Sequence, residues 1–414
     1  MICVNLCNMR SLRKYIKNLT TICITPMIKV IPRQRNKWLF GAGQNFKDNP
    51  KYLFYWTNEH HPEIRSIWIA HLRYDVEKLK KQGYEVYYWS SLKGLYHALT
   101  AKVYISDHQI GDINAFFSGG AFYVNLWHGS SVKRVRWQAP QLFVKRFNLK
   151  DAAEMRTSLR FRVLQYPIMF RKPDLLLAPS SIQAKDFFAP MMDISLDKCI
   201  VGVYPRSILL LEGKETALEF IHKYEPQETV EFVTEIGKYN KVYMYMPTWR
   251  NDGNDFIAQA GIDWERLNNN MKEKNELFIL KFHPFTKIDL PKIEQFSHII
   301  IYPKSSDIYT VLPFIDVLVT DYSSIYTDFL TMDKEIILFV FDYDSYVKQS
   351  YELSEFDKYF VAKKAYNFEE LLNIMKSGQD CHVPPKERER LLDFFWDSNN
   401  KRIDIVEEIK KHQY

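Results

Sequence analysis

Two histidines follow apolar runs of the chain, and either could move a proton. His128 lies in the segment NLWHGS (125–130), and His283 follows the run LFILKF (277–282). An imidazole titrates near neutral pH, so it can take a proton from an attacking alcohol. Each could instead be a packed or hydrogen-bonded loop histidine. The sequence therefore offers one candidate acid–base group in each half of the chain.

Hydroxyl groups and an arginine follow two further apolar runs. Arg250 ends the segment YMPTWR (245–250), and its guanidinium offers a planar fork of donors that suits phosphate. A helix is predicted to start near Ser323, where free backbone N–H groups would favour an anion. A surface arginine and ordinary helix capping are the alternatives. The candidate phosphate-binding residues of these segments are Thr248, Arg250, Thr320, Asp321, Ser323 and Ser324.

A short glycine turn and several absent motifs narrow the chemistry. Gly41 and Gly43 follow the run KWLF, but Phe46 stands where a dinucleotide fingerprint needs a third glycine. We interpret the turn as a close approach near a cleft. The chain has no GxxxxGK[ST], GxSxG or HExxH motif. The late Asp342-Tyr343-Asp344 is not expected to hold a catalytic metal. Phosphate chemistry without an obligatory metal or cofactor is the prediction.

The elements that must position these residues alternate between apolar runs and helical patterns, which is typical of an α/β fold. The runs are apolar on both faces, as in a covered parallel sheet, whose strands end at the edge where ligands bind. The predicted strands of the first half are Lys37–Phe40, Ser66–Ala70, Tyr84–Trp89, Val103–Ser106, Phe122–Leu126 and Leu175–Ala178. Those of the second half are Val242–Met246, Leu277–Phe282, Ile299–Tyr302, Val317–Thr320 and Ile336–Phe341.

The two series of strands predict two domains. We expect a basic amphipathic N-terminal segment (1–35), a Rossmann-like domain (36–207), a charged helical connection (208–238), a second Rossmann-like domain (239–378) and C-terminal helices (379–414). The best apolar stretch, 15–32, is interrupted by charges and a proline, so neither a signal peptide nor a membrane span is expected. Basic residues flank it, so it could lie on an anionic bilayer or simply pack as a helix.

Composition excludes several classes of protein. The chain has 414 residues, 46% hydrophobic and 26% charged, which excludes a disordered chain, a collagen-like chain and a small disulfide scaffold. Its net charge of +6 suits an anionic ligand or membrane surface without indicating nucleic acid. Five cysteines without a CxxC pair predict a reduced chain and make zinc unexpected.

Five short motifs occur in the order of a known family. NLWHGSSVK, GVYPRS, YMPTWR, KFHP and VTDYSSIYTDF together resemble the CDP-glycerol glycerophosphotransferase family, which includes teichoic-acid primases and polymerases and capsule-polymer relatives. FGAG (40–43) and DNPKY (48–52) extend the resemblance upstream, so that it covers about residues 38–375. It implies a GT-B-like architecture, in which two Rossmann-type domains face each other across a cleft, the first for the acceptor and the second for the donor.

The resemblance also implies an activity. A polyol phosphate, most simply glycerol phosphate, would move from a CDP-linked donor to a hydroxyl of a lipid-linked glycan or growing polymer, with release of CMP. The enzyme would be peripheral at the cytoplasmic face of the membrane. His128 matches the candidate general base, and His283 would bind or protonate the leaving group. The remaining matched positions are Arg250, Thr248, Thr320, Asp321, Ser323, Ser324 and Arg206 for the donor phosphates, and Gly129, Lys133, Gly41 and Gly43 on the acceptor side.

Other functions stay open at this point. The donor could be CDP-ribitol, and the product could be a capsule rather than a teichoic acid. A glycosyltransferase on the same fold would attack an anomeric carbon of a nucleotide sugar instead of phosphorus. A non-enzymatic scaffold is the third possibility, against which the presence of both His128 and His283 argues.

Overall fold

The computed structural model describes residues 23–43, 45–130, 171–248, 250, 256–282, 293–303, 306–349, 355–397 and 402–413. The chain forms two compact units. Unit 1 comprises Met1–His128, Arg134–Arg206 and Asn399–Tyr414. Unit 2 comprises Gly129–Lys133 and Ser207–Ser398.

Unit 1 is built on a parallel sheet of seven strands in the order β3-β2-β1-β4-β5-β6-β7. Its strands are β1 (Gln34–Phe40), β2 (Arg65–Ala70), β3 (Val86–Tyr88), β4 (Ala101–Ser106), β5 (Phe122–Asn125), β6 (Leu175–Ala178) and β7 (Cys199–Val201). Every neighbouring pair is parallel. The strand order reverses between β1 and β4, which is where doubly wound sheets form ligand crevices.

Helices cover this sheet. They are α2 (Asp48–His60), α3 (Arg73–Lys81), α4 (Leu92–Thr100), α7 (Ser181–Gln183), α8 (Ala189–Met192) and α19 (Ile405–Gln413). Helix α2 packs on β1, β2 and β4, and its Phe54 ring meets Phe40 and Trp68 edge to face. Such aromatic pairs add to the stabilisation from burial. The carboxyl end of the sheet therefore rests on a rigid core.

Unit 2 repeats this plan with six parallel strands in the order β10-β9-β8-β11-β12-β13. They are β8 (Lys241–Met246), β9 (Glu276–Leu280), β10 (Ile299–Ile301), β11 (Val317–Thr320), β12 (Glu335–Phe339) and β13 (Lys363–Ala365). All pairs are parallel. The order reverses between β8 and β11, so the segments after these two strands meet at one point of the edge.

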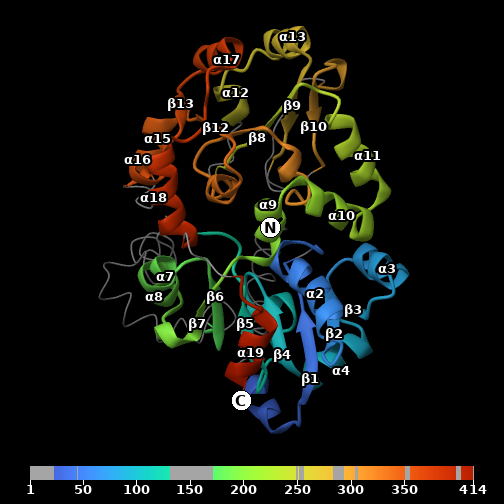
Figure 1. Cartoon of the computed structure of the whole chain (residues 1–414). Helices are drawn as coiled ribbons and strands as arrows, with labels where there is room; N and C mark the ends of the chain where they lie inside the picture. Colours follow the sequence, from blue (N-terminus) through green and yellow to red (C-terminus); the bar gives the residue numbers. More distant parts are fainter. Residues whose placement is uncertain are drawn as a thin grey trace, which may run out of the picture. The chain divides into compact units, whose positions relative to one another are not determined.

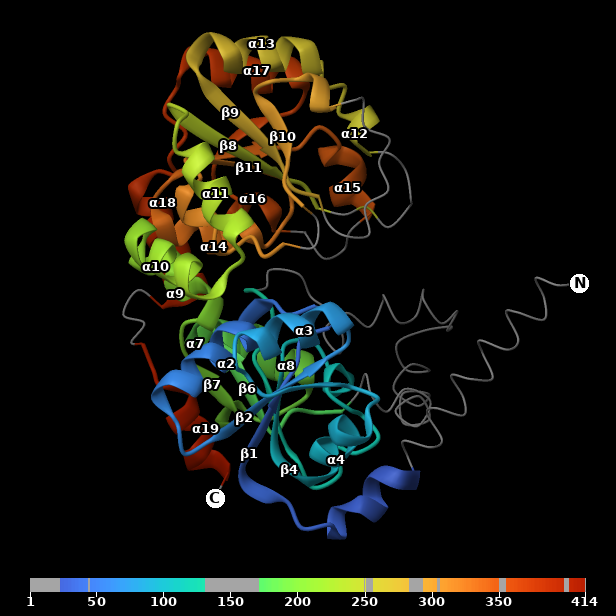
Figure 2. The same ribbon diagram turned by 90° about the vertical axis from the view of Figure 1, so that its right-hand side faces the viewer.

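The helices of unit 2 lie on both sides of its sheet (Figures 1 and 2). They are α9 (Ile208–Glu212), α10 (Lys214–Tyr224), α11 (Gln227–Ile236), α12 (Phe256–Gln259), α13 (Trp264–Lys274), α14 (Ile325–Phe329), α15 (Tyr343–Gln349), α16 (Phe356–Tyr359), α17 (Phe368–Ser377) and α18 (Pro385–Trp396). The side chains of Asp263 and Asn367 cap α13 and α17 by accepting backbone N–H groups, which stabilises a helix start.

The structure divides the chain differently from the expected ranges at two places. The expected connection, 208–238, forms α9, α10 and α11, which belong to unit 2 because their apolar faces pack within it; Leu209, Ala217 and Ile221 are buried. The expected pair of C-terminal helices is split, since α18 belongs to unit 2 and α19 lies along the strands of unit 1 (Figure 1). Residues 1–22 of the expected N-terminal segment lie outside the described residues.

Two edge strands, β7 and β13, were not predicted from the sequence. β7 has three residues, of which only Ile200 is buried. β13 begins with two lysines and buries only Ala365. β13 therefore lacks an apolar run, and the run of β7 ends after three residues at Gly202. No helix of the described residues is long and apolar enough to cross a bilayer.

Candidate active site

His128 directly follows a turn at the end of β5. The turn is closed by Asn125, whose side-chain oxygen accepts the backbone N–H of Trp127 at 2.8 Å. Trp127 adopts a φ of 52° and Gly129 a φ of 143°. The second value favours glycine, because a Cβ atom is strained there. This sharp change of direction presents the half-buried imidazole of His128 at the carboxyl edge of the sheet.

The hydrogen bond of the His128 ring defines which nitrogen can act as a base. Nδ1 lies 3.2 Å from the backbone oxygen of Asp107. A carbonyl oxygen only accepts, so in the neutral ring Nδ1 carries the proton and Nε2 carries the lone pair. The ring is stacked between Trp127 and His108, at centroid distances of 4.4 and 4.2 Å. The geometry thus holds a neutral imidazole in one orientation with Nε2 available.

Burial and a neighbouring positive charge keep His128 neutral. Burial, followed by the charge of His108, lowers the pKa of His128 to about 3. His108 is itself shifted upward: burial opposes the change, but the charge of Asp107 and their ion pair, with 2.9 Å between Nδ1 and Oδ1, raise the pKa of His108. A neutral imidazole at physiological pH can accept a proton from an alcohol.

Asn49 and Arg206, which are distant in the sequence, hold the backbone of this loop, and Asp48 pairs with Arg206. Asn49 donates from its side-chain amide to the Trp127 carbonyl at 2.8 Å and accepts the backbone N–H of Arg206. Arg206 donates from Nη2 to the His128 carbonyl at 3.0 Å and from Nη1 to Asp48 at 2.7 Å. Burial works against ionisation of Asp48, but Arg206 holds the pKa of its carboxyl below the usual value. His128 is therefore held by a buried ion pair.

Arg206 is predicted from the sequence as a donor phosphate ligand, and that role stays a prediction. In the structure it lies in unit 1 and donates to the His128 carbonyl, with its side chain 3% exposed. Its signal in the sequence was the motif GVYPRS, and the signal for its partners was DNPKY. Neither motif shows that the two meet, because 158 residues separate Arg206 from Asp48. Arg206 positions the loop.

The glycine turn after β1 lies in the same unit. Gly41 passes so close to the chain that a Cβ atom there would stand 2.8 Å from the backbone oxygen of Asp112. Gly43 has a φ of 30° and open space around it. The close approach expected of this turn is thus met at Gly41, by the 107–113 loop that carries His108. Lys133 lies outside the described residues.

In unit 2, Asp321 gathers the segments that follow β8 and β11. Its Oδ1 accepts the backbone N–H and the hydroxyl of Thr248, at 2.8 and 2.6 Å, and the N–H of Tyr322. Its Oδ2 accepts from Arg250 at 2.9 Å. Thr320 donates its hydroxyl to the Met246 carbonyl at 2.7 Å. The structure therefore brings the predicted residues Thr248, Arg250, Thr320 and Asp321 together.

The guanidinium of Arg250 is used almost entirely within this cluster. Besides Asp321, it donates to both carboxylate oxygens of Asp342, at 2.8 and 3.1 Å, and from Nη1 to the Thr248 carbonyl. It also lies over the ring of Tyr346, at 4.5 Å from the centroid. Two carboxylates match its single charge, so Arg250 as placed here organises the strand ends and has little capacity left for phosphate. Asp342 was quoted in the sequence analysis only as part of an unpromising DYD segment.

The serines after Asp321 face outward. Ser324 is exposed and Ser323 is partly exposed, whereas the residues of α14 that follow are buried. Ser324 is the N-cap residue of α14, but its side chain makes no capping hydrogen bond. α14 has five residues, so its dipole alone is a weak attraction for an anion. Ser324 is thus the most exposed residue of the predicted set in unit 2, and Ser323 Oγ accepts the backbone N–H of Ile325 at 3.5 Å.

Two further points concern His283 and metals. His283 lies outside the described residues, so its predicted role stays a prediction. Asp107, His108 and Asp112 each bring one ligand atom within 4.8 Å of the others. The ion pair with Asp107 favours protonated His108, and a protonated imidazole does not ligate a metal. As placed here, the cluster serves to charge His108 beside His128.

The sequence matches one protein family and is similar to two of its characterised relatives. The sequence model of the family described as CDP-Glycerol:Poly(glycerophosphate) glycerophosphotransferase matches residues 24–403. A teichoic acid poly(glycerol phosphate) polymerase of Bacillus subtilis (strain 168) is 23% identical over 339 residues, which is 77% of this chain but 41% of that protein. A teichoic acid glycerol-phosphate transferase of Staphylococcus aureus (strain NCTC 8325 / PS 47) is 24% identical, with 81% of this chain and 82% of that protein covered.

The fold is also found among solved structures. The wall teichoic acid polymerase TagF superimposes with a TM-score of 0.71 at 18% sequence identity, and the match covers 98% of both chains. At this identity the match establishes the shared fold, a mixed α/β architecture with parallel sheets.

Proposed function

Because the chain belongs to the CDP-Glycerol:Poly(glycerophosphate) glycerophosphotransferase family, we propose that it transfers glycerol phosphate from CDP-glycerol to a hydroxyl of a growing or lipid-linked polymer and releases CMP. The observation that carries the proposal is the state of His128. It is a neutral imidazole, fixed by the Asp107 carbonyl, with Nε2 free to accept a proton at the edge of a parallel sheet.

The proposed step moves one proton and exchanges one bond to phosphorus. The acceptor hydroxyl attacks the phosphorus that carries glycerol, and Nε2 of His128 takes the hydroxyl proton. The bond between this phosphorus and the bridging oxygen of the diphosphate breaks, and CMP leaves with the bonding electrons. His283 would stabilise or protonate CMP as it departs. Positioned acid–base groups typically contribute 10²–10⁴-fold to such a rate.

On the donor side, the proposal assigns different roles to residues that the sequence grouped together. Ser323 and Ser324 would contact the diphosphate, since Ser324 is exposed and Ser323 is partly exposed. Arg250, Asp321 and Thr248 would hold the segment in place, because they bond mainly to one another. No obligatory metal or cofactor is part of the proposal.

The wider arrangement is part of the same proposal. We place the acceptor in unit 1 and the CDP-linked donor in unit 2, across the cleft of a GT-B-like enzyme. We also propose that the basic N-terminal segment holds the protein at the cytoplasmic face of the membrane, where a lipid-linked acceptor resides. A teichoic acid or a capsule polymer would serve as the product.

CMP release by the purified full chain tests the proposal. CDP-glycerol, CDP-ribitol and a UDP-sugar would each be supplied with and without a membrane extract that contains acceptor. Acceptor-dependent CMP from CDP-glycerol is the expected result. CMP from CDP-ribitol alone would change the donor and keep the reaction class. Release of UDP from the nucleotide sugar, with no CMP, would replace the proposal by a glycosyltransferase.

A further inference from the structure

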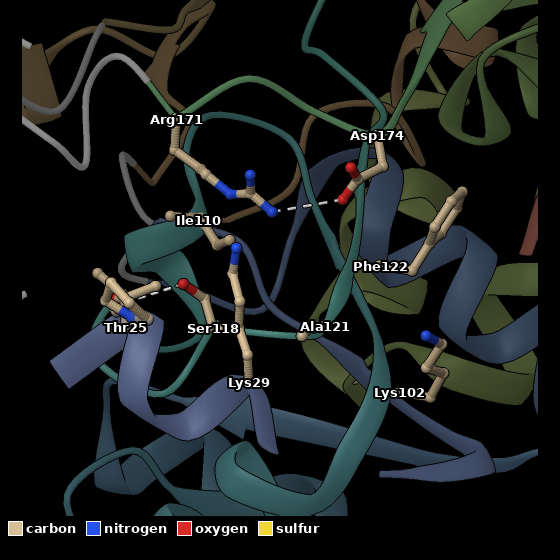
Figure 3. A pocket seen from close by; sticks show the side chains of 13 residues that line it. Thr25, Lys29, Lys102, Ile110, Ser118, Ala121, Phe122, Arg171 and Asp174 are labelled. Carbon is tan, nitrogen blue, oxygen red and sulfur yellow. Dashed lines mark hydrogen bonds and ion pairs between the residues drawn. The ribbon is translucent and has the colours of Figure 1, made fainter. Parts of the chain in front are cut away.

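A basic cavity of about 550 Å³ opens at the amino end of the sheet in unit 1. It is lined by the start of β4 and β5, by the residues before β6 and by the helical N-terminal residues 25–29 (Figure 3). His128 follows the opposite end of β5, and a four-residue strand spans about 13 Å. The cavity is therefore not part of the acid–base site.

The lining carries an excess of positive charge. Lys29, Lys102 and Arg171 contribute three cations and Asp174 one carboxylate, which leaves an excess of two positive charges. Lys29 and Arg171 extend into the same space from opposite sides in Figure 3. Neither lysine ammonium forms a hydrogen bond or ion pair within the part of the chain that the structure describes.

Arg171 is held only loosely by Asp174, so its guanidinium can turn to a ligand. Its Nη2 is 3.5 Å from Asp174, a long contact, and its Nε is buried without a hydrogen-bond partner among the described residues. The same Asp174 oxygen already accepts the backbone N–H of Tyr123 at 2.9 Å. A guanidinium with unused donors beside two free ammonium groups suits the oxygens of a phosphate ester.

A fourth cation, Arg33, contacts the glycines of the cavity wall without lining the cavity itself. The guanidinium of Arg33 donates to the backbone oxygens of Ala98, Ala101, Phe117 and Gly119. It forms no ion pair with a carboxylate of the described residues. Carbonyl groups solvate this charge without cancelling it, so it adds to the positive potential felt by an anion in the cavity.

Two glycines let the N-terminal segment form the wall. A Cβ atom on Gly119 would stand 1.9 Å from the backbone oxygen of Thr25, and one on Gly120 would stand 3.5 Å from the Cα of Lys29. Only glycine permits so close an approach at position 119. On the same segment Met27 is 72% exposed and Val30 is 84% exposed. Apolar side chains beside a cationic cavity are the combination found on surfaces that lie on anionic bilayers.

We propose that this cavity is a binding site for a phosphate ester, and that its natural source is the headgroup of an anionic phospholipid. The headgroup phosphate would bind to Lys29, Lys102 and Arg171, while Met27 and Val30 enter the acyl boundary. This inference rests on the membrane association proposed above but not on the transfer reaction. A soluble glycerol phosphate is the other source of the same chemistry.

The test uses the full chain and two double variants with equal loss of charge. Lys29→Gln/Lys102→Gln removes the two free cations of the cavity. Lys80→Gln/Lys81→Gln removes two exposed lysines of α3, which do not line it. Flotation measures binding to vesicles of phosphatidylcholine with and without about 30% phosphatidylglycerol. Calorimetry measures binding of sn-glycerol 3-phosphate. Thermal melting checks that both variants fold, and Lys102→Gln alone replaces the pair if it does not.

We expect the cavity variant to lose about 30-fold in affinity for anionic vesicles, since a lysine near such a surface contributes about 1 kcal/mol. The control should lose less than about two-fold. Added sn-glycerol 3-phosphate should release the wild type from vesicles more effectively than sodium chloride of equal ionic strength. A variant that loses only sn-glycerol 3-phosphate would keep the phosphate-ester site and reject the lipid source. Equal binding by wild type, variant and control to both probes would overturn the proposal.

Discussion

Units 1 and 2 each carry an arginine paired with aspartate behind the carboxyl end of a parallel sheet, but the two pairs have different consequences. In unit 1, Arg206 bonds to Asp48 and to the backbone carbonyl of His128, and the imidazole remains available. In unit 2, Arg250 bonds to Asp321 and Asp342, while Ser323 and Ser324 beyond it are partly exposed and exposed. In both units, the buried arginine bonds to aspartate and to a backbone carbonyl of the loop.

Arg206 and Arg250 both follow strands within motifs, yet both bond to aspartate. A guanidinium buried without a carboxylate is costly, so burial and pairing go together. An arginine that follows a strand within a motif can serve phosphate or an aspartate, and the sequence does not distinguish the two. The structure favours the aspartate for both Arg206 and Arg250.

The largest expected effect is on the rate of CMP release and comes from substitution of His128, the neutral imidazole of unit 1. His128→Ala should lower acceptor-dependent CMP release by about 10²–10⁴-fold, because no other described group replaces Nε2 as the base. Thermal melting should be little changed, since the ring is half-buried. A folded variant that retains the wild-type rate would remove His128 from the mechanism.

The second effect is on the stability of unit 2. Arg250→Gln leaves the buried carboxylate of Asp321 without its cation and should cost about 3–5 kcal/mol in the free energy of unfolding. A double-mutant cycle with Asp342→Asn should give a coupling of about 1–3 kcal/mol in urea unfolding. If Arg250 instead contacts the donor, the coupling will be near zero and the main change will be a higher KM for CDP-glycerol.

Arg206→Gln should lower stability less than Arg250→Gln does, and it should also lower turnover. Arg206→Gln removes the ion pair with Asp48 and should cost about 3 kcal/mol, because Asp48 keeps some access to water. The His128 loop loses a support, so kcat should fall while the KM for CDP-glycerol stays the same. Arg65→Gln, which breaks the exposed pair with Glu85, is the control and should cost less than about 1 kcal/mol. An increase in KM alone would return Arg206 to the donor site.

The smallest expected effect is a loss of stability that tests how the N-terminal segment packs at the amino end of the unit 1 sheet. Gly119→Ala places a methyl group against the Thr25 carbonyl and should cost about 1–3 kcal/mol by overpacking. It should also increase proteolysis near the N-terminal segment. Gly237→Ala is the matched control, because its φ is −66° and a Cβ there makes only ordinary contacts. Equal melting temperatures for the two variants would mean that the N-terminal segment does not pack on Gly119 in solution.

The central strands could be predicted to within three residues at each end. Leu175–Ala178 and Val317–Thr320 agree with β6 and β11 because all four residues of each are apolar or fully buried. β7 and β13 could not, since β13 begins with two lysines and the apolar run of β7 is cut short by Gly202. The carboxyl-edge location of the candidate site followed from the same pattern.

The direction of each site side chain could not be predicted. Arg250 meets Asp342 across 92 residues and Arg206 meets Asp48 across 158, and no local spacing encodes these encounters. The charge that tunes His128 was missed for the same reason. His108 and Asp107 lie on the loop after β4, and only strand pairing between β4 and β5 brings them to His128.

The pH dependence of kcat/KM, compared between wild type and His108→Gln, tests the central claim most directly. Burial and the charge of His108 lower the pKa of His128, so the base form persists as the pH falls. The wild-type rate of CMP release should show no acid limb from His128 near pH 6.5. Loss of the His108 charge should raise the pKa of His128 and move the acid limb to higher pH. A wild-type limb at 6.5 that His108→Gln leaves in place would contradict the account.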